Sequence, residues 1–217
     1  MCRAYCQFWF ASDIDSTTKS ARPGAIAGVH ARCCSVSGER SRAGRLGYHV
    51  PMRFQLHQGY LPTAIGRVAE LHARHYSALV GFGLPFEAKV ARELAEFCER
   101  YDESRDGLWL LLQDGRVEGS IAIDGARAAE QGAHLRWFIT SDLVRGKGAG
   151  TALLNAAMAF CQSRHYPRVY LWTFEGLHAA RHLYEKFGFT LVYQEPGTQW
   201  GREVTEQRFE RQSDSLG

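Results

Sequence analysis

The pattern of apolar and polar positions along the 217-residue chain changes at about residue 52. Residues 1–51 show no sustained helical or strand period. After them, short apolar runs alternate with stretches of helical spacing, beginning with 62–75 and 85–101. Asp114-Gly115 stands between two apolar runs, as in a two-residue hairpin turn. The pattern predicts, in order, a strand, two helices, three strands, a helix, a strand, a helix and two strands.

Proline and glycine add signals for the helix ends. Pro62 suits a first helical turn, and Gly188 suits a helix C-terminus. The expected strands are 52–57, 109–113, 116–123, 135–139, 168–173, 189–195 and 204–210, and the last two helices are 151–164 and 179–187.

The segment from Thr140 to Thr151 is the most informative part of the chain, because it joins an expected strand to an expected helix. Glycine lets backbone N–H groups approach a ligand closely. A helix N-terminus adds unpaired donors and the positive end of the helix dipole. We therefore expect a phosphate or pyrophosphate site here. The segment holds three glycines and two cations, Gly146, Gly148, Gly150, Arg145 and Lys147.

Three motifs compete for this segment. The P-loop pattern fails because Gly148 follows Lys147, and the dinucleotide fingerprint fails because Thr151 occupies the place of its third glycine. The pattern R-x-x-G-x-G is met in full by Arg145, Gly148 and Gly150. Further along, 179–189 reads A-A-R-H-L-Y-E-K-F-G-F. Together the two segments resemble the two signatures of the GNAT superfamily of acetyltransferases.

This resemblance implies a fold and a reaction. The fold is α/β, with a mixed, mostly antiparallel central sheet of about seven strands flanked by about four helices, over residues 52–212. The reaction moves an acetyl group from acetyl-CoA, the co-substrate, to a primary amine on a small molecule or peptide. Phe138 and Thr140 would pair with the pantetheine arm, and an N–H near Phe138 or Ile139 would stabilise the oxyanion. The residues implied for acetyl-CoA are Phe138, Ile139, Thr140, Val144, Arg145, Gly146, Lys147, Gly148, Ala149, Gly150 and Thr151.

Tyr184 matches the tyrosine that protonates the leaving sulfur in this family. Its usual pKa of ~10 lies above the ~8.5 of a thiol, so this proton transfer is mildly uphill in water. The alternative is a half-buried packing tyrosine. The base that takes the amine's proton is open among Glu118, His134 and Glu175; Glu118 could equally be a solvent-facing strand residue, and a water chain could replace a base. Leu177 stands where the family often has an asparagine.

Three tryptophans could shape an acceptor pocket, with core packing expected for at least two of them. They are Trp109, Trp137 and Trp172.

Composition and charge bear on three kinds of partner: nucleic acid, membrane and metal. The net charge is +3, yet residues 1–50 hold 7 Lys/Arg against 3 Asp/Glu, and residues 51–217 hold 19 against 20. The predicted domain is thus nearly neutral, which gives no support to nucleic-acid binding. No apolar run approaches the length of a membrane span. His178 and His182 have a zinc-compatible spacing but no third ligand, so no metal is expected.

Residues 1–51 are expected to be a disordered extension or sequence upstream of the natural start. Their cysteine spacings match no zinc pattern. Few cysteines in the domain and no secretory signal suggest the cytoplasm, and a homodimer is common in such families.

Two other functions remain open. A nucleotide-binding redox module would use the same glycine loop, with Glu175 as a ribose ligand, and a non-catalytic acyl-CoA sensor would bind without turnover. The chain also resembles the acetyltransferase domains fused behind MarR-type regulators, on Leu171-Trp172-Thr173, 179–188 and Gln199-Trp200-Gly201.

Overall fold

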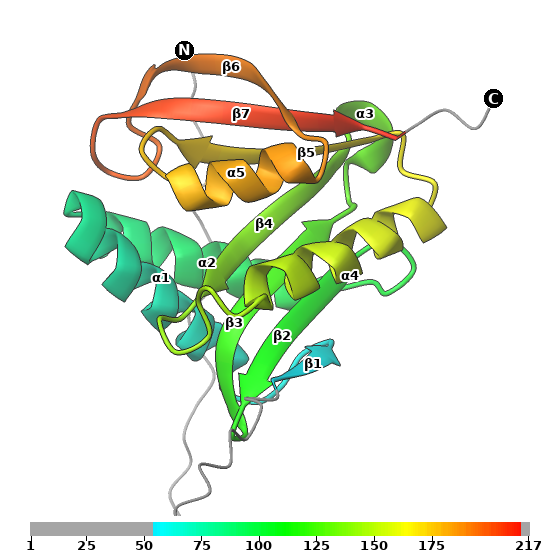
Figure 1. Cartoon of the computed structure of the whole chain (residues 1–217), viewed down its shortest axis with the longest axis horizontal. Coiled ribbons are helices and arrows are strands. Elements are labelled where there is room, and N and C mark those ends of the chain that lie inside the picture. The colour runs from blue at the N-terminus through cyan, green and yellow to red at the C-terminus, as the bar shows by residue number, and fades with distance from the viewer. Residues whose placement is uncertain (1–53, 214–217) are drawn as a thin grey trace, which may run out of the picture. The chain divides into compact units, whose positions relative to one another are not determined.

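Seven strands form one sheet in the order β1-β2-β3-β4-β5-β7-β6 (Figure 1). The computed structural model describes residues 54–213; the predicted N-terminal extension and the predicted strand start at Met52 lie outside the described residues. Neighbouring strands are antiparallel except β4 and β5, which run parallel. This confirms the mixed, mostly antiparallel sheet. The strands are β1 (Gln55–Gln58), β2 (Gly107–Gln113), β3 (Arg116–Asp124), β4 (Ala133–Thr140), β5 (Arg168–Phe174), β6 (Thr190–Gly197) and β7 (Val204–Gln212).

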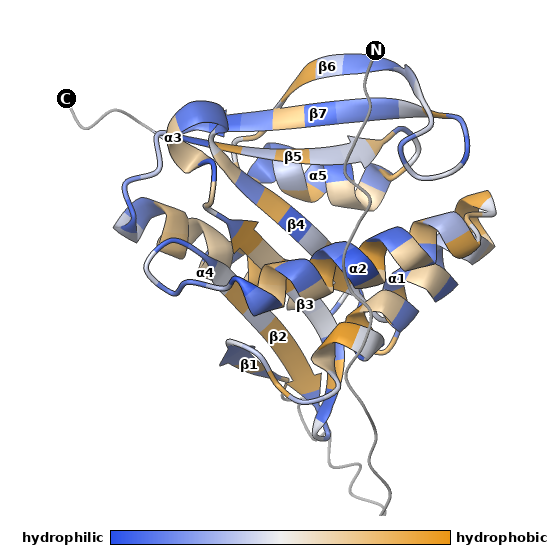
Figure 2. Ribbon diagram, turned by 180° about the vertical axis from the view of Figure 1, so that it is seen from behind, coloured by the Kyte–Doolittle hydropathy of each residue, from blue (hydrophilic) through white to orange (hydrophobic). Residues whose placement is uncertain are grey.

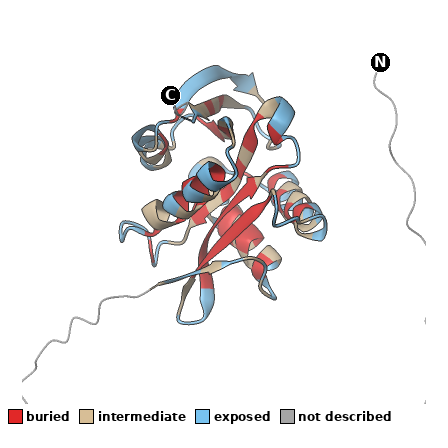
Figure 3. Cartoon of the chain, turned by 90° about the vertical axis from the view of Figure 1, so that its right-hand side faces the viewer, coloured by how far each residue is buried: buried red, intermediate tan, exposed pale blue. Residues whose placement is uncertain are grey.

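Helices cover both faces of this sheet (Figures 1 and 2). Trp109 and Leu111 of β2 belong to the core cluster that includes α4, whereas Leu108 and Leu110 belong to the cluster that includes α1 and α2. A strand alternates its side chains between faces, so β2 is apolar throughout because both of its faces are covered. Figure 3 shows the buried central strands and the exposed β6. The helices are α1 (Ala64–Val80), α2 (Leu84–Glu99), α3 (Ala128–Gln131), α4 (Ala149–Ser163) and α5 (His178–Lys186).

Two turns form as their residues predict. Asp114 and Gly115 have φ of 51° and 76°, the conformation that a tight hairpin turn needs. Gly188 has a φ of 81°, two residues after the end of α5, and there glycine avoids the cost of a left-handed backbone.

One local prediction is wrong, and one short helix was not predicted. Pro62 lies before α1 rather than in its first turn, because Thr63 takes a left-handed conformation and the helix begins at Ala64. The sequence also gave no sign of α3, since four residues are too few to show a helical period.

Within residues 54–213, no helix is long and apolar enough to cross a membrane. The same residues contain no group of three histidine, cysteine or acidic side chains that could hold a metal ion.

Candidate active site

Strands β4 and β5 are paired only where they start. Ala133 faces Val169 and His134 faces Tyr170, and the register records no further pairs. Both strands continue, to Thr140 and Phe174. The second half of β4 therefore has no strand partner on its β5 side, which leaves backbone groups there available to a ligand.

A bulge in β4 marks the point where the strands part. Trp137 and Phe138 stand opposite the single residue Ile121 of β3, and Trp137 has a φ of 47°. Leu135 packs in the cluster on the α4 side, but Trp137 packs in the cluster on the α1 and α2 side. Ser120 Oγ donates to the Trp137 carbonyl at 2.7 Å. The bulge thus re-aims the side chains of β4 beside the opening.

The predicted glycine loop connects β4 to α4 at this opening. Gly148 caps the start of α4 with a φ of 84°. No hydrogen-bond acceptor within residues 54–213 is recorded for the backbone N–H groups of Gly146, Gly148, Ala149 and Gly150. These donors lie at the positive end of the α4 dipole, so the geometry suits an anion.

The glycines of the loop have different tasks. A Cβ at Gly146 or Gly148 would meet no atom within 4 Å. A Cβ at Gly150 would lie 3.0 Å from Leu183 Cδ1 and 3.3 Å from Phe138 Cζ. Gly150 therefore lets α4 pack closely against α5 and β4. From the sequence, Gly150 was expected only to contact the ligand.

Arg145 lies against the end of β4 rather than over the free amides. Its Nη2 donates to the Thr140 carbonyl at 3.0 Å and lies 3.4 Å from His75 Nδ1, and its Nη1 pairs with Asp142. The Thr140 carbonyl, predicted to contact pantetheine, is thus already hydrogen-bonded. The positive charge of Arg145 nevertheless lies beside the glycine loop.

Other residues predicted for the cofactor support the loop itself. Val144 is buried in the cluster around α4, and Ile139 is buried on β4. Lys147 Nζ donates to the Leu143 carbonyl at 2.6 Å. Thr151 is half-buried in the first turn of α4.

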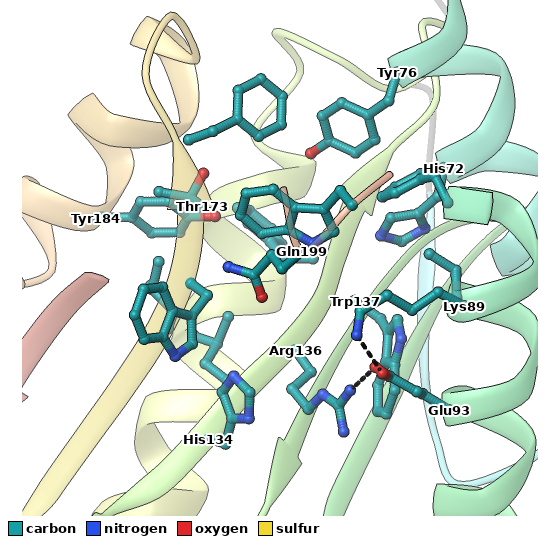
Figure 4. A pocket seen from close by; sticks show the side chains of 18 residues that line it. His72, Tyr76, Lys89, Glu93, His134, Arg136, Trp137, Thr173, Tyr184 and Gln199 are labelled. Carbon is teal, nitrogen blue, oxygen red and sulfur yellow. Dashed lines mark hydrogen bonds and ion pairs between the residues drawn. The ribbon is translucent and has the colours of Figure 1, made fainter. Parts of the chain in front are cut away.

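A cavity of about 360 Å³ lies between the parted strands, α1, α2 and α5. One part of its wall is charged: Glu93 of α2 binds Lys89 Nζ at 2.7 Å and also pairs with Arg136 of β4 (Figure 4). The rest is largely aromatic, with Tyr76, Phe86, Trp137, Trp172, Phe174 and Trp200 among its residues.

Tyr184 lies in the wall of this cavity (Figure 4). Its side chain is 6% exposed, and its ring lies about 6 Å from those of Phe138, Phe189 and Phe209. Burial raises the pKa of the phenol well above its usual value, and Tyr76 adds to the effect. No hydrogen-bond partner is recorded for its hydroxyl within residues 54–213. The hydroxyl therefore stays protonated and free to donate to a ligand.

Glu118 is not the solvent-facing residue that the sequence allowed. It is 2% exposed, and both of its carboxylate oxygens accept hydrogen bonds from Arg67 Nη2, at 2.9 and 3.0 Å. It does not line the cavity. A buried carboxylate needs such a partner, so its side chain serves to join α1 to β3.

The other two candidate bases, His134 and Glu175, border different cavities. His134 lines the cavity beside the paired end of β4, where its ring stacks on Tyr170 with centroids 4.4 Å apart. Loss of water lowers its pKa to about 3, and Arg136 adds to the shift. Glu175 follows β5 and borders a separate, smaller cavity of about 60 Å³.

The tryptophans divide between core and cavity. Core packing was expected for at least two of the three, and Trp109 packs in the core on the α4 side of the sheet. Trp137 and Trp172 both line the cavity, although Trp137 also belongs to the α1 and α2 core.

The family resemblance implies that the first two helices shape the acceptor pocket, but sequence reasoning singled out none of their residues. His72 and Tyr76 of α1 line the cavity together with Lys89 and Glu93 of α2. The only signal was helical spacing, which marks a buried face and does not distinguish a core from a ligand pocket.

Stability should fall as the pH drops below 6.5 because of His72. Burial lowers the pKa of His72 from 6.5 to about 4 in the folded protein. Between these values the unfolded chain takes up a proton that the folded protein does not, so the free energy of unfolding decreases as the pH falls. At pH 5 the loss from this histidine is about 2 kcal/mol. Urea unfolding at pH 7 and pH 5 measures it; a His72→Asn variant should lose less over this interval, and an equal loss would contradict the assignment.

Comparison with known families gives a match to the acetyltransferase (GNAT) family over residues 68–189. This is more than half of the chain, and it includes the glycine loop and Tyr184. The chain therefore belongs to the GNAT family of acetyltransferases.

Solved structures of acetyltransferases share the fold. An acetyltransferase from Streptococcus agalactiae is 18% identical, with 74% of this chain and 98% of that chain covered and a TM-score of 0.58. A GNAT acetyltransferase from Staphylococcus aureus Mu50 is 15% identical, with 74% and 99% covered and a TM-score of 0.61. A third, from Elizabethkingia anophelis with acetyl-CoA bound, is 14% identical, with 74% and 98% covered and a TM-score of 0.51. At these identities the likeness shows the fold alone.

Comparison with curated proteins gives no match. The resemblance to domains fused to MarR-type regulators is not addressed by these matches and stays a prediction.

Proposed function

We propose that this protein transfers an acetyl group from acetyl-CoA to a primary amine, with Tyr184 as the general acid. One observation carries the proposal: the opening between β4 and β5 has unpaired loop amides beside it and the free phenol of Tyr184 in its wall. Membership of an acetyltransferase family supports the reaction class.

The loop offers what the pyrophosphate of acetyl-CoA requires. The N–H groups of Gly146, Gly148, Ala149 and Gly150 supply donors at the start of α4, and Arg145 and Lys147 add positive charge. The unpaired stretch from Phe138 to Thr140 would receive the pantetheine arm as an added strand, which leads the thioester toward the cavity. The Thr140 carbonyl would have to release Arg145 for this, and the guanidinium could then turn to a phosphate.

The chemistry follows from this placement. Acetyl-CoA supplies the acyl group as a thioester, whose carbonyl carbon the amine nitrogen attacks. A backbone N–H of Phe138 or Ile139 would stabilise the oxyanion that forms. Tyr184 would give its proton to the departing sulfur. Burial raises the pKa of the phenol, which keeps it protonated at neutral pH but makes this transfer more uphill than for a free tyrosine.

The aromatic wall favours an acceptor whose amine is attached to an apolar or aromatic body. We do not propose Glu118 as the base, since its carboxylate is bound by Arg67. The redox alternative is not favoured, because a dinucleotide fold uses several parallel strand pairs and β4–β5 is the one parallel pair among the described strands. The cytoplasm and a homodimer stay predictions from the sequence.

Calorimetric titration with acetyl-CoA, with NAD as the parallel ligand, tests the first half of the proposal. We expect acetyl-CoA to bind and NAD not to bind. Thiol release from acetyl-CoA in the presence of benzylamine, tryptamine, spermidine or kanamycin tests the second half. If acetyl-CoA binds but none of these amines causes thiol release, the acyl-CoA sensor is favoured instead. If a folded protein does not bind acetyl-CoA, acetyl-CoA is excluded as the co-substrate.

Replacing Gly148 by alanine tests the loop. Its φ of 84° is left-handed, and the added methyl would meet nothing within 4 Å, so the cost is one of backbone conformation. We expect stability to fall by about 1 kcal/mol and acetyl-CoA to bind several-fold more weakly, because the amide at the start of α4 is displaced. Urea unfolding and calorimetry measure the two effects.

Gly59→Ala is the matched control. Gly59 also has a left-handed φ, of 95°, and open space around its Cβ, but it lies before α1 and outside the loop. Its variant should lose similar stability and keep the affinity for acetyl-CoA. Equal weakening of acetyl-CoA binding in both variants would mean that the loop has no special role.

A further inference from the structure

His72 of α1 is held in one orientation by its own helix. Its Nδ1 lies 2.8 Å from the carbonyl oxygen of Val68, one turn earlier. A carbonyl oxygen only accepts hydrogen bonds, so Nδ1 carries the proton. In the neutral ring the lone pair is then on Nε2.

That lone pair has no recorded partner within residues 54–213. His72 is 6% exposed, and its ring lies in the cavity wall, on the side opposite Tyr184 (Figure 4). Nε2 is not fully buried, and it can accept a hydrogen bond from the cavity side. A donor placed in the cavity would therefore be bound at Nε2.

Apart from His134, the other titratable groups around the cavity are occupied or protonated. Lys89 and Arg136 share Glu93, and burial raises the pKa of Tyr184 and that of Tyr76, the latter to about 12. His134 lies at the closed end of the opening with its ring stacked on Tyr170, and no hydrogen bond fixes its tautomer. His72 is thus the proton acceptor whose lone pair is fixed in direction.

We propose that Nε2 of His72 accepts the proton that the acceptor amine loses during acetyl transfer, so that His72 is the general base of the reaction. This inference rests on the proposed function. It adds a catalytic residue from α1, a helix that carries neither of the two sequence signatures.

Each proton in this transfer has a donor and an acceptor. The amine nitrogen bonds to the thioester carbonyl carbon and gains positive charge, which makes its N–H acidic. That proton passes to Nε2 and forms an imidazolium. The C–S bond then breaks, and the sulfur takes the proton of Tyr184. Return of one proton from His72 to the Tyr184 phenolate, through solvent, restores both residues and leaves an amide and a free thiol.

The low basicity of His72 decides when it acts. Burial lowers its pKa to about 4, so it cannot take a proton from a free ammonium ion. It accepts the proton only after attack has begun. The amine must therefore enter uncharged, and we expect kcat/KM to follow the fraction of free amine, with no inflection from His72 between pH 6 and 9. Among the neighbours of His72, His75 also has a pKa below its usual value, chiefly because of burial.

The variant His72→Asn tests the proposal. The asparagine amide can still donate to the Val68 carbonyl, but it has no atom at the place of Nε2. With benzylamine, tryptamine or spermidine as the acceptor, we expect kcat to fall at least tenfold while acetyl-CoA binds as before. His72→Gln keeps more of the volume and should be impaired as well, since an amide oxygen accepts a hydrogen bond but does not take up the proton. Wild-type kcat in His72→Asn would overturn the proposal, as would a larger loss in His134→Asn than in His72→Asn.

Chemical rescue separates a base from a structural residue. In His72→Ala, added imidazole should occupy the space of the ring and raise kcat in proportion to its free-base form. Unchanged kcat with imidazole, in a variant that still binds acetyl-CoA, would contradict the role. His165→Asn is the matched control, because His165 is exposed between α4 and β5 and its φ of 55° is one that asparagine tolerates.

Failure of the proposed function gives a different result. If the wild-type protein releases no thiol with any of these amines, acetyl transfer is not supported and the base has no reaction to serve. The geometry of His72 is tested separately by ¹⁵N NMR of its ring. We expect a proton on Nδ1 and none on Nε2 at pH 7, and a proton on Nε2 would overturn the inference by itself.

Discussion

Replacing Tyr184 by phenylalanine is expected to lower kcat by about 10²–10⁴-fold, the usual contribution of a positioned acid. The phenol lines the cavity and has no recorded hydrogen-bond partner within the described residues. Its removal therefore leaves no protein group unsatisfied, and the ring keeps its packing against Phe138, Phe189 and Phe209. Acetyl-CoA should bind with unchanged affinity. Thiol release and calorimetry measure the two properties on the same preparation.

The matched control is Tyr60→Phe. Tyr60 is 55% exposed and lies before α1, outside the cavity. This variant should keep full turnover. Full turnover in Tyr184→Phe as well would show that Tyr184 is not the general acid. The proton on the sulfur would then come from solvent. A fall in acetyl-CoA affinity that matches the loss of kcat would instead indicate a binding role.

Replacing Arg67 by methionine is expected to destabilise the fold by about 3–5 kcal/mol, because it leaves a buried carboxylate without its partner. Arg67 binds both oxygens of Glu118, which is 2% exposed, and its Nε donates to the Val117 carbonyl at 2.9 Å. Arg116 lies 3.7 Å from Glu118, but its own side chain is 61% exposed, so it replaces little of the lost interaction. Urea unfolding at pH 7 measures the change.

Two further variants identify the cause of that loss. Arg74→Met removes an ion pair with Glu70 at 2.9 Å whose arginine is 79% exposed, and it should change stability by less than about 0.5 kcal/mol. The double variant Arg67→Met with Glu118→Leu should recover most of the loss, since no buried charge remains. A small effect of Arg67→Met alone would show that water reaches Glu118 after the substitution.

This ion pair also bears on the proposed reaction. It fixes α1 against β3, and α1 places His72 and Tyr76 in the cavity wall. Glu118 was a candidate base from the sequence because a carboxylate on a hairpin strand suits that role. Its partner lies on a helix about fifty residues earlier, and no local pattern records such a pairing.

The sequence by itself determined the features that depend on neighbouring residues. The period of apolar positions located the strands and the four longer helices, Asp114 and Gly115 specified the hairpin, and the spacing of Arg145, Gly148 and Gly150 specified a tight strand-to-helix connection. These predictions succeeded because hydrogen bonding within a helix or turn, and the freedom of glycine, act over a few residues. The segment around Tyr184 was recognised differently, by its resemblance to the second signature of the GNAT family.

The tertiary structure alone decided how these elements form a site. The bulge at Trp137 reverses the alternation of β4 because β3 pairs with it out of register there, a contact between distant segments. The carbonyl that binds Arg145, the arginine that binds Glu118 and the cavity that brings His72 opposite Tyr184 likewise depend on which surfaces are buried together. Burial and the pKa values that follow from it are properties of the packed protein. The sequence therefore specified the parts of the site, and packing specified their partners and their protonation.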